Sequence, residues 1–147
     1  KIREFVRDGR VDVASRLLGR TYFVRGVVEH GEKRGRGLKY PTANLRTERE
    51  LLPRIGVYAT RAVLDDGTEV DSVTNVGLRP TFDGQGVRIE AHLLDAADDL
   101  YGRKLELRFV LRLRDEQKFG GPEELRAQIA RDIEAARTAL ARNVSRT

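Results

Sequence analysis

Residues 57–76, VYATRAVLDDGTEVDSVTNV, contain two strand-like runs on either side of an Asp-Asp-Gly turn. Val57 to Leu64 and Thr68 to Val76 are rich in β-branched residues, which favour extended backbone. Aspartate followed by glycine suits a tight turn, because glycine accepts a positive φ. This stretch therefore predicts an antiparallel hairpin.

Similar runs lie on both sides of this hairpin. They are Tyr22 to Glu29, PTANL at 41–45, Val87 to Leu94 and Lys104 to Arg114. Arg79 to Gly86 is predicted as a loop because it contains one proline and two glycines, and Ala96 to Gly102 as a connection. Six strands joined by mostly short turns favour a mainly β fold with a closed antiparallel barrel.

Helices are predicted at both ends of the chain. Lys1 to Asp8 has apolar residues at helical spacing, and Asp12 is placed to cap a second short helix that ends at Gly19. Near the other end, Pro122 suits a first helical turn. A stripe of apolar residues follows and is predicted to pack on the barrel: Leu125, Ile129, Ile133, Ala136 and Leu140.

Composition limits the possible classes. The chain has 147 residues with a net charge of +5, 39% hydrophobic and 35% charged residues, no cysteine and two histidines. This is enough for one domain with a core, and it excludes disulfides and thiolate metal sites. The basic balance favours an anionic partner such as a nucleotide or a nucleic acid, although an arginine-rich surface alone would give the same charge. No apolar run is long enough to span a bilayer and no signal peptide is visible, so a cytoplasmic location is expected.

The candidate site begins in the stretch from His30 to Leu45, HGEKRGRGLKYPTANL. Its glycines allow backbone N–H groups to approach phosphate oxygens, and its lysines and arginines supply positive charge. Pro41 disfavours a helix, so Thr42 and Asn44 share one face of an extended segment. Their oxygens could complete the shell of a magnesium ion bound to a polyphosphate. A plain surface loop that leads into a strand is the alternative.

The chain resembles the riboflavin kinase family, specifically the kinase module of bacterial bifunctional FAD synthetases. The resemblance covers nearly the whole chain. It is carried by PTANL and, in order, by GVYA at 56–59, NVGLRPTF at 75–82, IEAHLLD at 89–95, DLYG at 99–102 and LRDEQKF at 113–119. It implies a six-stranded Greek-key barrel, with residues 21–147 as the kinase domain. Residues 1–20 would then be a helical linker from an N-terminal adenylyltransferase module that the chain lacks.

The resemblance also implies an activity, the phosphorylation of riboflavin by ATP with Mg²⁺ to give FMN and ADP. Glu90 falls at the position of the catalytic base, which accepts the proton of the ribityl 5′-hydroxyl. The full-length parent would also convert FMN to FAD. Residues implied at the ATP site are His30, Gly31, Arg36, Thr42, Leu93, Asp95 and Tyr101. Those implied at the flavin site are Arg114, Gln117 and Phe119, while Thr42 and Asn44 would hold the metal. His92 remains a structural or supporting residue.

One position departs from the family pattern. Lys39 stands where the family usually has glycine before Tyr-Pro-Thr-Ala-Asn or Phe-Pro-Thr-Ala-Asn, which puts the geometry of the loop in question. Two other functions stay open from the sequence. One is a barrel that binds flavin without catalysis. The other is a small basic barrel that binds single-stranded nucleic acid, which the low aromatic content of 6% disfavours.

Overall fold

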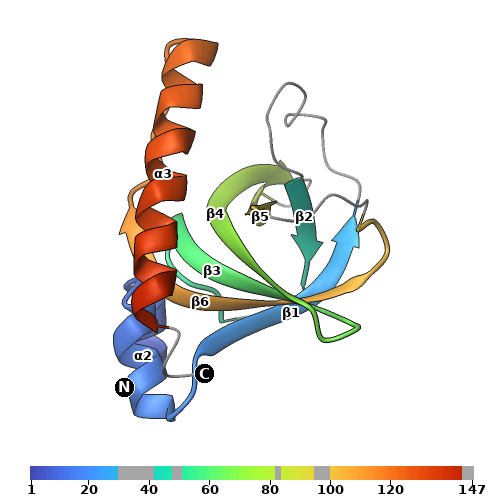
Figure 1. The fold of residues 1–147 in the computed structure, drawn as a ribbon, viewed down its shortest axis with the longest axis vertical. Coiled ribbons are helices and arrows are strands. Elements are labelled where there is room, and N and C mark those ends of the chain that lie inside the picture. Colours follow the sequence, from blue (N-terminus) through green and yellow to red (C-terminus); the bar gives the residue numbers. More distant parts are fainter. Residues whose placement is uncertain (30–41, 48–50, 82–83, 95–99, 144–147) are drawn as a thin grey trace.

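The structure is a computed structural model that describes residues 1–29, 42–47, 51–81, 84–94 and 100–143. Three helices and six strands lie in these ranges (Figure 1). In chain order they are α1 (Ile2–Arg7), α2 (Val11–Leu18), β1 (Tyr22–Glu29), β2 (Thr42–Arg46), β3 (Gly56–Leu64), β4 (Glu69–Thr81), β5 (Gly84–Leu93), β6 (Lys104–Arg114) and α3 (Pro122–Asn143).

The strands form a closed barrel in the order β1-β2-β5-β4-β3-β6, and all neighbours are antiparallel. Strands β3, β4 and β5 follow one another, while β2 lies beside β5 and β6 lies beside β3. A fourth strand that returns beside the first of three consecutive strands is a Greek key. The predicted barrel is therefore confirmed.

The barrel closes tightly where β1 meets β2. At Gly26, a Cβ atom would lie 2.2 Å from the backbone oxygen of Arg46. No side chain fits at that distance, so the close pairing of these two strands depends on a glycine at this position.

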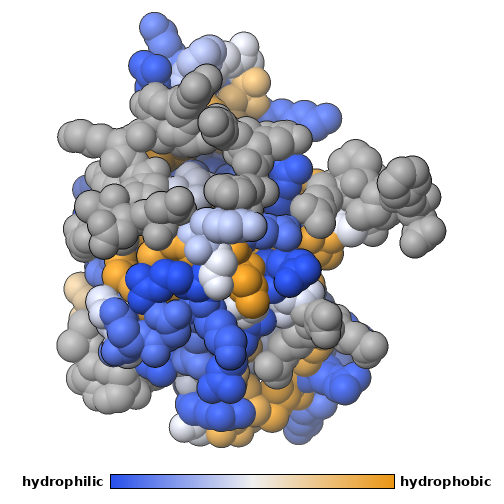
Figure 2. All heavy atoms as spheres, turned by 90° about the vertical axis from the view of Figure 1, so that its right-hand side faces the viewer, coloured by the Kyte–Doolittle hydropathy of each residue, from blue (hydrophilic) through white to orange (hydrophobic). Residues whose placement is uncertain are grey.

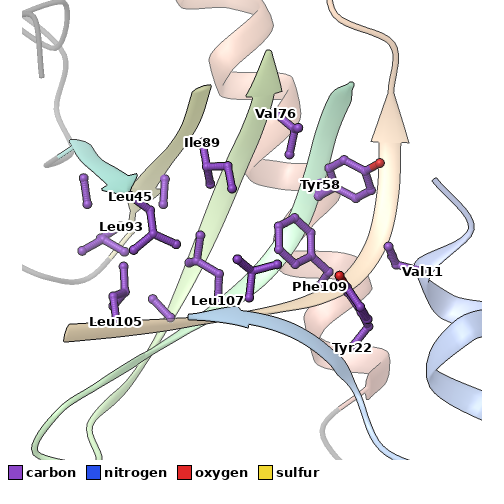
Figure 3. Packing of buried hydrophobic residues seen from close by; sticks show 14 of the residues in the cluster. Val11, Tyr22, Leu45, Tyr58, Val76, Ile89, Leu93, Leu105, Leu107 and Phe109 are labelled. Carbon is purple, nitrogen blue, oxygen red and sulfur yellow. The ribbon is translucent and has the colours of Figure 1, made fainter. Parts of the chain in front are cut away.

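Most side chains inside the barrel are apolar, and a small cluster of hydrogen-bonded hydroxyl groups from β3 and β4 is buried among them. Figure 3 shows side chains from several strands pointing into it, among them Val76 of β4, Ile89 of β5 and Phe109 of β6. The ring of Phe109 packs edge-on against Tyr58 with 5.2 Å between ring centroids. Since side chains alternate along a strand, the neighbours of these residues point to the outer face.

The N-terminal helices belong to the same core. Val6 of α1 and Val11 and Ala14 of α2 are fully buried in the cluster that fills the barrel. The range 1–20, predicted as a helical linker, thus packs against the barrel. The predicted cap is wrong, because α2 begins at Val11 after Arg10 and places Asp12 in its first turn. A carboxylate is still favourable there, since the start of a helix carries partial positive charge.

The long helix α3 runs along one side of the barrel and extends past it (Figure 1). Ala136 and Leu140 are buried against the outer faces of β3, β4 and β6, as the apolar stripe predicts. Leu125, in the first turns, is 37% exposed. The first half of α3 therefore lies largely beyond this contact.

The predicted loop Arg79 to Gly86 is wrong in part. β4 continues to Thr81 and β5 begins at Gly84, and the register pairs Arg79 with Gly86. The hairpin runs past the barrel as a two-stranded ribbon, where a proline without an N–H is tolerated. In this ribbon Leu78 and Val87 pair with each other and are 50% and 41% exposed.

Charged side chains lie on the surface, with the exception of the buried Arg61 and Asp132. Figure 2, which faces the right-hand side of Figure 1, shows hydrophilic side chains beside smaller hydrophobic areas. Among the described residues, no helix is both long enough and apolar enough to cross a bilayer.

Candidate functional site

Three polar side chains stand in one row across adjacent strands. The register places Asn44 of β2 opposite Glu90 of β5, and Glu90 opposite Asn75 of β4. Their neighbours Leu45, Ile89 and Val76 are buried inside the barrel. The three polar side chains therefore point outward together, with adjacent Cβ atoms about 5 Å apart.

A second row lies one step along the same strands. Thr42 pairs with His92 in the register, and its Oγ1 lies 3.1 Å from the Nδ1 atom of His92. The other ring nitrogen, Nε2, lies 3.7 Å from Oε1 of Glu90. The imidazole thus stands between the predicted metal ligand and the predicted base.

The charge of His92 follows from its surroundings. Burial lowers the pKa of the imidazole and outweighs the nearby negative charges of Glu90 and Asp132, which would raise it. The ring is therefore neutral at pH 7. In the tautomer with the proton on Nε2, it accepts a hydrogen bond from the Thr42 hydroxyl and directs an N–H toward Glu90.

A cavity of about 240 Å³ lies between this outer barrel face and α3. Its polar wall combines the strand rows with the segment that follows β6, and its apolar wall comes from the first half of α3. The polar and aromatic lining includes Asn75, Glu90, His92, Arg114, Gln117 and Phe119. The cavity therefore brings the predicted base together with all three predicted flavin residues.

Arg114 is held in place from α3. Its Nε and Nη2 atoms each donate to Asp132 at 2.8 Å, and Nη1 donates to the backbone oxygen of Asp115 at 2.8 Å. Gln128 donates to the same carboxylate at 2.9 Å. The guanidinium carbon also lies 5.9 Å from the ring centroid of Phe119. A bidentate pair of this kind orients the guanidinium strongly.

The other predicted site residues that the structure describes do not line this cavity. Leu93 is fully buried in the barrel core, so its side chain faces away from the cavity. Tyr101 is 54% exposed, and its neighbour Gly102 donates a backbone hydrogen bond to Val28 near the end of β1. Since β1 ends beside β2, Tyr101 lies on the Asn44 side of the site. His30, Gly31, Arg36 and Asp95, as well as Lys39, lie outside the described residues.

Sequence reasoning did not identify Asp132, Gln128 or Asn75. Asp132 is 6% exposed and lies between Ile129 and Ile133 on the apolar side of α3. An acid within an apolar stripe was the available signal, because such a group needs a partner when it is buried. The described residues contain no group of three or more His, Cys, Asp or Glu side chains that could hold a metal.

Comparisons with known proteins agree with this architecture. The model of the riboflavin kinase family, Flavokinase, matches residues 18–140. The chain is 41% identical over 147 residues to a bifunctional riboflavin kinase/FMN adenylyltransferase of Pseudomonas fluorescens, with 99% of this chain and 47% of the relative covered. It is 40% identical over 136 residues to the Escherichia coli K12 protein of the same name, covering 92% of this chain and 44% of that protein. The chain thus spans less than half the length of these relatives.

Two solved structures are similar. A macrolide-efflux protein from Streptococcus pneumoniae has a TM-score of 0.87 at 36% identity, covering 92% of this chain and 45% of that one. Riboflavin kinase from Trypanosoma brucei has a TM-score of 0.59 at 19% identity, covering 85% of each chain, and supports the fold alone. The family match over residues 18–140 confirms what the motifs indicated: the chain belongs to the riboflavin kinase family.

Proposed function

We propose that this chain transfers the γ-phosphoryl group of ATP to the ribityl 5′-hydroxyl of riboflavin, giving FMN and ADP. The observation that carries the proposal is the row in which Asn44 stands beside Glu90 at the wall of the cavity that holds Arg114 and Phe119. The Glu90 carboxylate thus lies between Asn44, which suits nucleotide oxygens, and the cavity residues that suit a flavin.

Glu90 is the proposed general base. The 5′-hydroxyl loses its proton as its oxygen attacks the γ-phosphorus, the bond from that phosphorus to the bridging oxygen of ADP breaks, and the carboxylate accepts the proton. Glu90 suits this role because it points out of the barrel into the cavity, while its strand neighbours Ile89 and Ala91 are fixed in the core. Rigid backbone on both sides keeps the carboxylate in position for the substrate.

Thr42 and Asn44 are the proposed ligands of the Mg–ATP complex. Both point away from the core, since Ala43 and Leu45 of the same strand are buried in it. Each offers a neutral oxygen, which suits Mg²⁺ that keeps phosphate and water ligands. A bound Mg²⁺ would offset negative charge on the phosphates. The contact with His92 leaves lone pairs on the Thr42 hydroxyl oxygen available.

The flavin side is proposed at Arg114, Gln117 and Phe119. The aromatic ring of Phe119 can pack on the isoalloxazine system, and the apolar wall from α3 extends that surface. A guanidinium has five N–H donors, of which the hydrogen bonds of Arg114 to Asp132 and Asp115 use three. The remaining donors can reach polar atoms of the ring.

The direct test is FMN production from riboflavin and Mg–ATP by the purified chain, followed by chromatography. The variant Glu90→Gln is expected to lower kcat by a factor of about 10²–10⁴ while ADP still binds. Glu116→Gln is the matched control, since Glu116 also lines the cavity but lies outside the strand row. Near-normal turnover in Glu90→Gln would remove Glu90 from the mechanism.

The nucleotide role has its own test. Asn44→Ala is expected to raise the KM for Mg–ATP more than the KM for riboflavin, because Asn44 stands on the β2 side of Glu90, away from the flavin residues. The opposite order of the two effects would contradict the assignment of Asn44.

The proposal extends to a longer parent protein. The relatives are named bifunctional riboflavin kinase/FMN adenylyltransferase, and this chain covers less than half of each. We propose that the parent also converts FMN to FAD through an N-terminal adenylyltransferase module, and that it works in the cytoplasm. FAD formation by the full-length protein, compared with FMN alone from this chain, tests the division of activities.

A further inference from the structure

Asn75 occupies a position that the mechanism above does not use. It stands directly opposite Glu90 in the register, on the side away from Asn44, and it lines the cavity. In the next strand, β3, the register places the apolar Val57 opposite Asn75. Asn75 is thus the polar residue that continues the Glu90 row toward the flavin side.

Within the described residues, the protein leaves the carboxamide oxygen of Asn75 unsatisfied. Its Oδ1 atom is buried and has no hydrogen-bond partner among the described residues. A buried carbonyl oxygen without a partner is unfavourable, so an apolar residue would serve packing better at this position. The neighbouring outward residue of the same strand, Val73, is indeed apolar. These observations indicate that the amide serves a ligand.

We propose that Asn75 is a substrate-binding residue that forms a hydrogen bond with a secondary hydroxyl of the ribityl chain. The inference rests on the proposed function, which places the terminal 5′-hydroxyl at Glu90. The Cβ atoms of Asn75 and Glu90 are about 5 Å apart, as for any directly paired residues. With the terminal hydroxyl at Glu90, the next hydroxyls of the same chain come within reach of Asn75.

A hydroxyl group matches this amide in either orientation. Rotation about the Cβ–Cγ bond exchanges Oδ1 with Nδ2, and this torsion has broad, roughly two-fold preferences. A hydroxyl can donate to the oxygen or accept from the nitrogen. Asn75 would therefore select a hydroxylated chain over an alkyl chain of the same length, and would help to present the terminal hydroxyl to the base.

The test compares two flavins and three proteins. Riboflavin and an analogue with a 5-hydroxypentyl chain, which keeps the terminal hydroxyl and lacks the secondary ones, are titrated by flavin fluorescence without ATP. The proteins are the wild type, Asn75→Val, and the control Leu78→Ala, which changes an exposed residue of the same strand outside the cavity lining. Melting temperatures are measured in parallel.

We expect Asn75→Val to weaken riboflavin binding by a factor of about 3–10, the effect of losing one hydrogen bond between uncharged groups. It should bind the hydroxypentyl analogue as the wild type does, and keep the wild-type KM for ATP. Its melting temperature should equal or exceed that of the wild type, because the unpaired oxygen is gone. Leu78→Ala should leave the affinities for both flavins unchanged.

Two results would overturn the inference. One is unchanged riboflavin affinity in Asn75→Val, and the other is an equal loss of affinity for both flavins. Because binding is measured without turnover, these outcomes are independent of FMN production by the wild type. A wild type that binds riboflavin with the expected dependence on Asn75 but makes no FMN would reject the proposed function and keep the binding site.

Discussion

Loss of the Asp132 carboxylate should show how strongly α3 is tied to the site. Asp132 is 6% exposed and accepts hydrogen bonds from Arg114 and Gln128, while the Arg114 side chain is 20% exposed. Asp132→Asn removes the negative charge and leaves the guanidinium half-buried without its partner. Removal of one member of a buried ion pair lowers the free energy of unfolding by about 3–5 kcal/mol. Because Arg114 keeps some exposure to solvent, we expect a loss of about 2–3 kcal/mol here.

Far-UV circular dichroism during urea and thermal unfolding measures this loss, since the chain has no tryptophan. At roughly 2–4 °C per kcal/mol for a protein of this size, the melting temperature should fall by about 4–12 °C. The control is Arg25→Gln, which breaks the ion pair with Glu106. Arg25 is 71% exposed, so the loss should stay below about 1 kcal/mol.

The double variant Arg114→Leu with Asp132→Leu completes the test. Removal of both charges should restore part of the stability, because no unpaired charge remains. A loss below about 1 kcal/mol in Asp132→Asn, or one equal to that of Arg25→Gln, would show that this pair contributes no more than an exposed ion pair.

Three further predictions concern the barrel. Gly26→Ala should reduce the free energy of unfolding by about 1–3 kcal/mol, because its Cβ would lie 2.2 Å from the Arg46 oxygen. The control Gly121→Ala, where a Cβ would meet no atom within 4 Å, should change this free energy little, and equal effects of the two variants in urea denaturation would contradict the close approach. Val6→Ala should lower the free energy of unfolding by about 2 kcal/mol, whereas Leu17→Ala, at an exposed position, should lower it by less than about 0.5 kcal/mol. If residues 1–20 only preceded the barrel without packing on it, the two variants would show no such difference. Burial acts to raise the pKa of Glu106, but hydrogen bonds from Arg108 and Arg25 outweigh it and lower the pKa overall. Above the ordinary glutamate pKa of about 4.3 the carboxylate therefore adds stability, and this stability is lost as the pH falls through the lower pKa of the folded state. Glu106→Gln should flatten the acid side of a plot of stability against pH, and an unchanged slope would contradict this.

Local patterns were sufficient for much of the fold. The β-branched runs in residues 57–76 and the Asp-Asp-Gly turn predict the β3–β4 hairpin because both depend on neighbours in the chain. The closure of the barrel is different, since β6 pairs with both β1 and β3, and β2 pairs with β5. Periodicity carries no information about such distant partners. The Greek-key order came from the family resemblance.

The errors have physical causes. Pro80 and two glycines suggested a loop, but backbone pairing continues past the barrel because a two-stranded ribbon tolerates a missing N–H. Glu90 was found through the resemblance, whereas Asn44 was already indicated by its place beside Thr42 on one face of the extended segment after Pro41. Asp132 was not found, because a carboxylate on a charged helix is usually solvated. Its place within the apolar stripe indicated a need for a partner, and the structure identifies that partner as Arg114.

The site depends on the division of the strands into an inner and an outer face. Ile89 and Ala91 of β5 are fixed in a close-packed core, and Glu90 between them faces the cavity. A close-packed interior relaxes only partly when a side chain is shortened. A change of core volume at Ile89 should therefore move the carboxylate by a fraction of an ångström without touching the substrate. Since the proposed phosphoryl transfer depends on positioning, such a change should lower kcat more than it lowers nucleotide or flavin affinity.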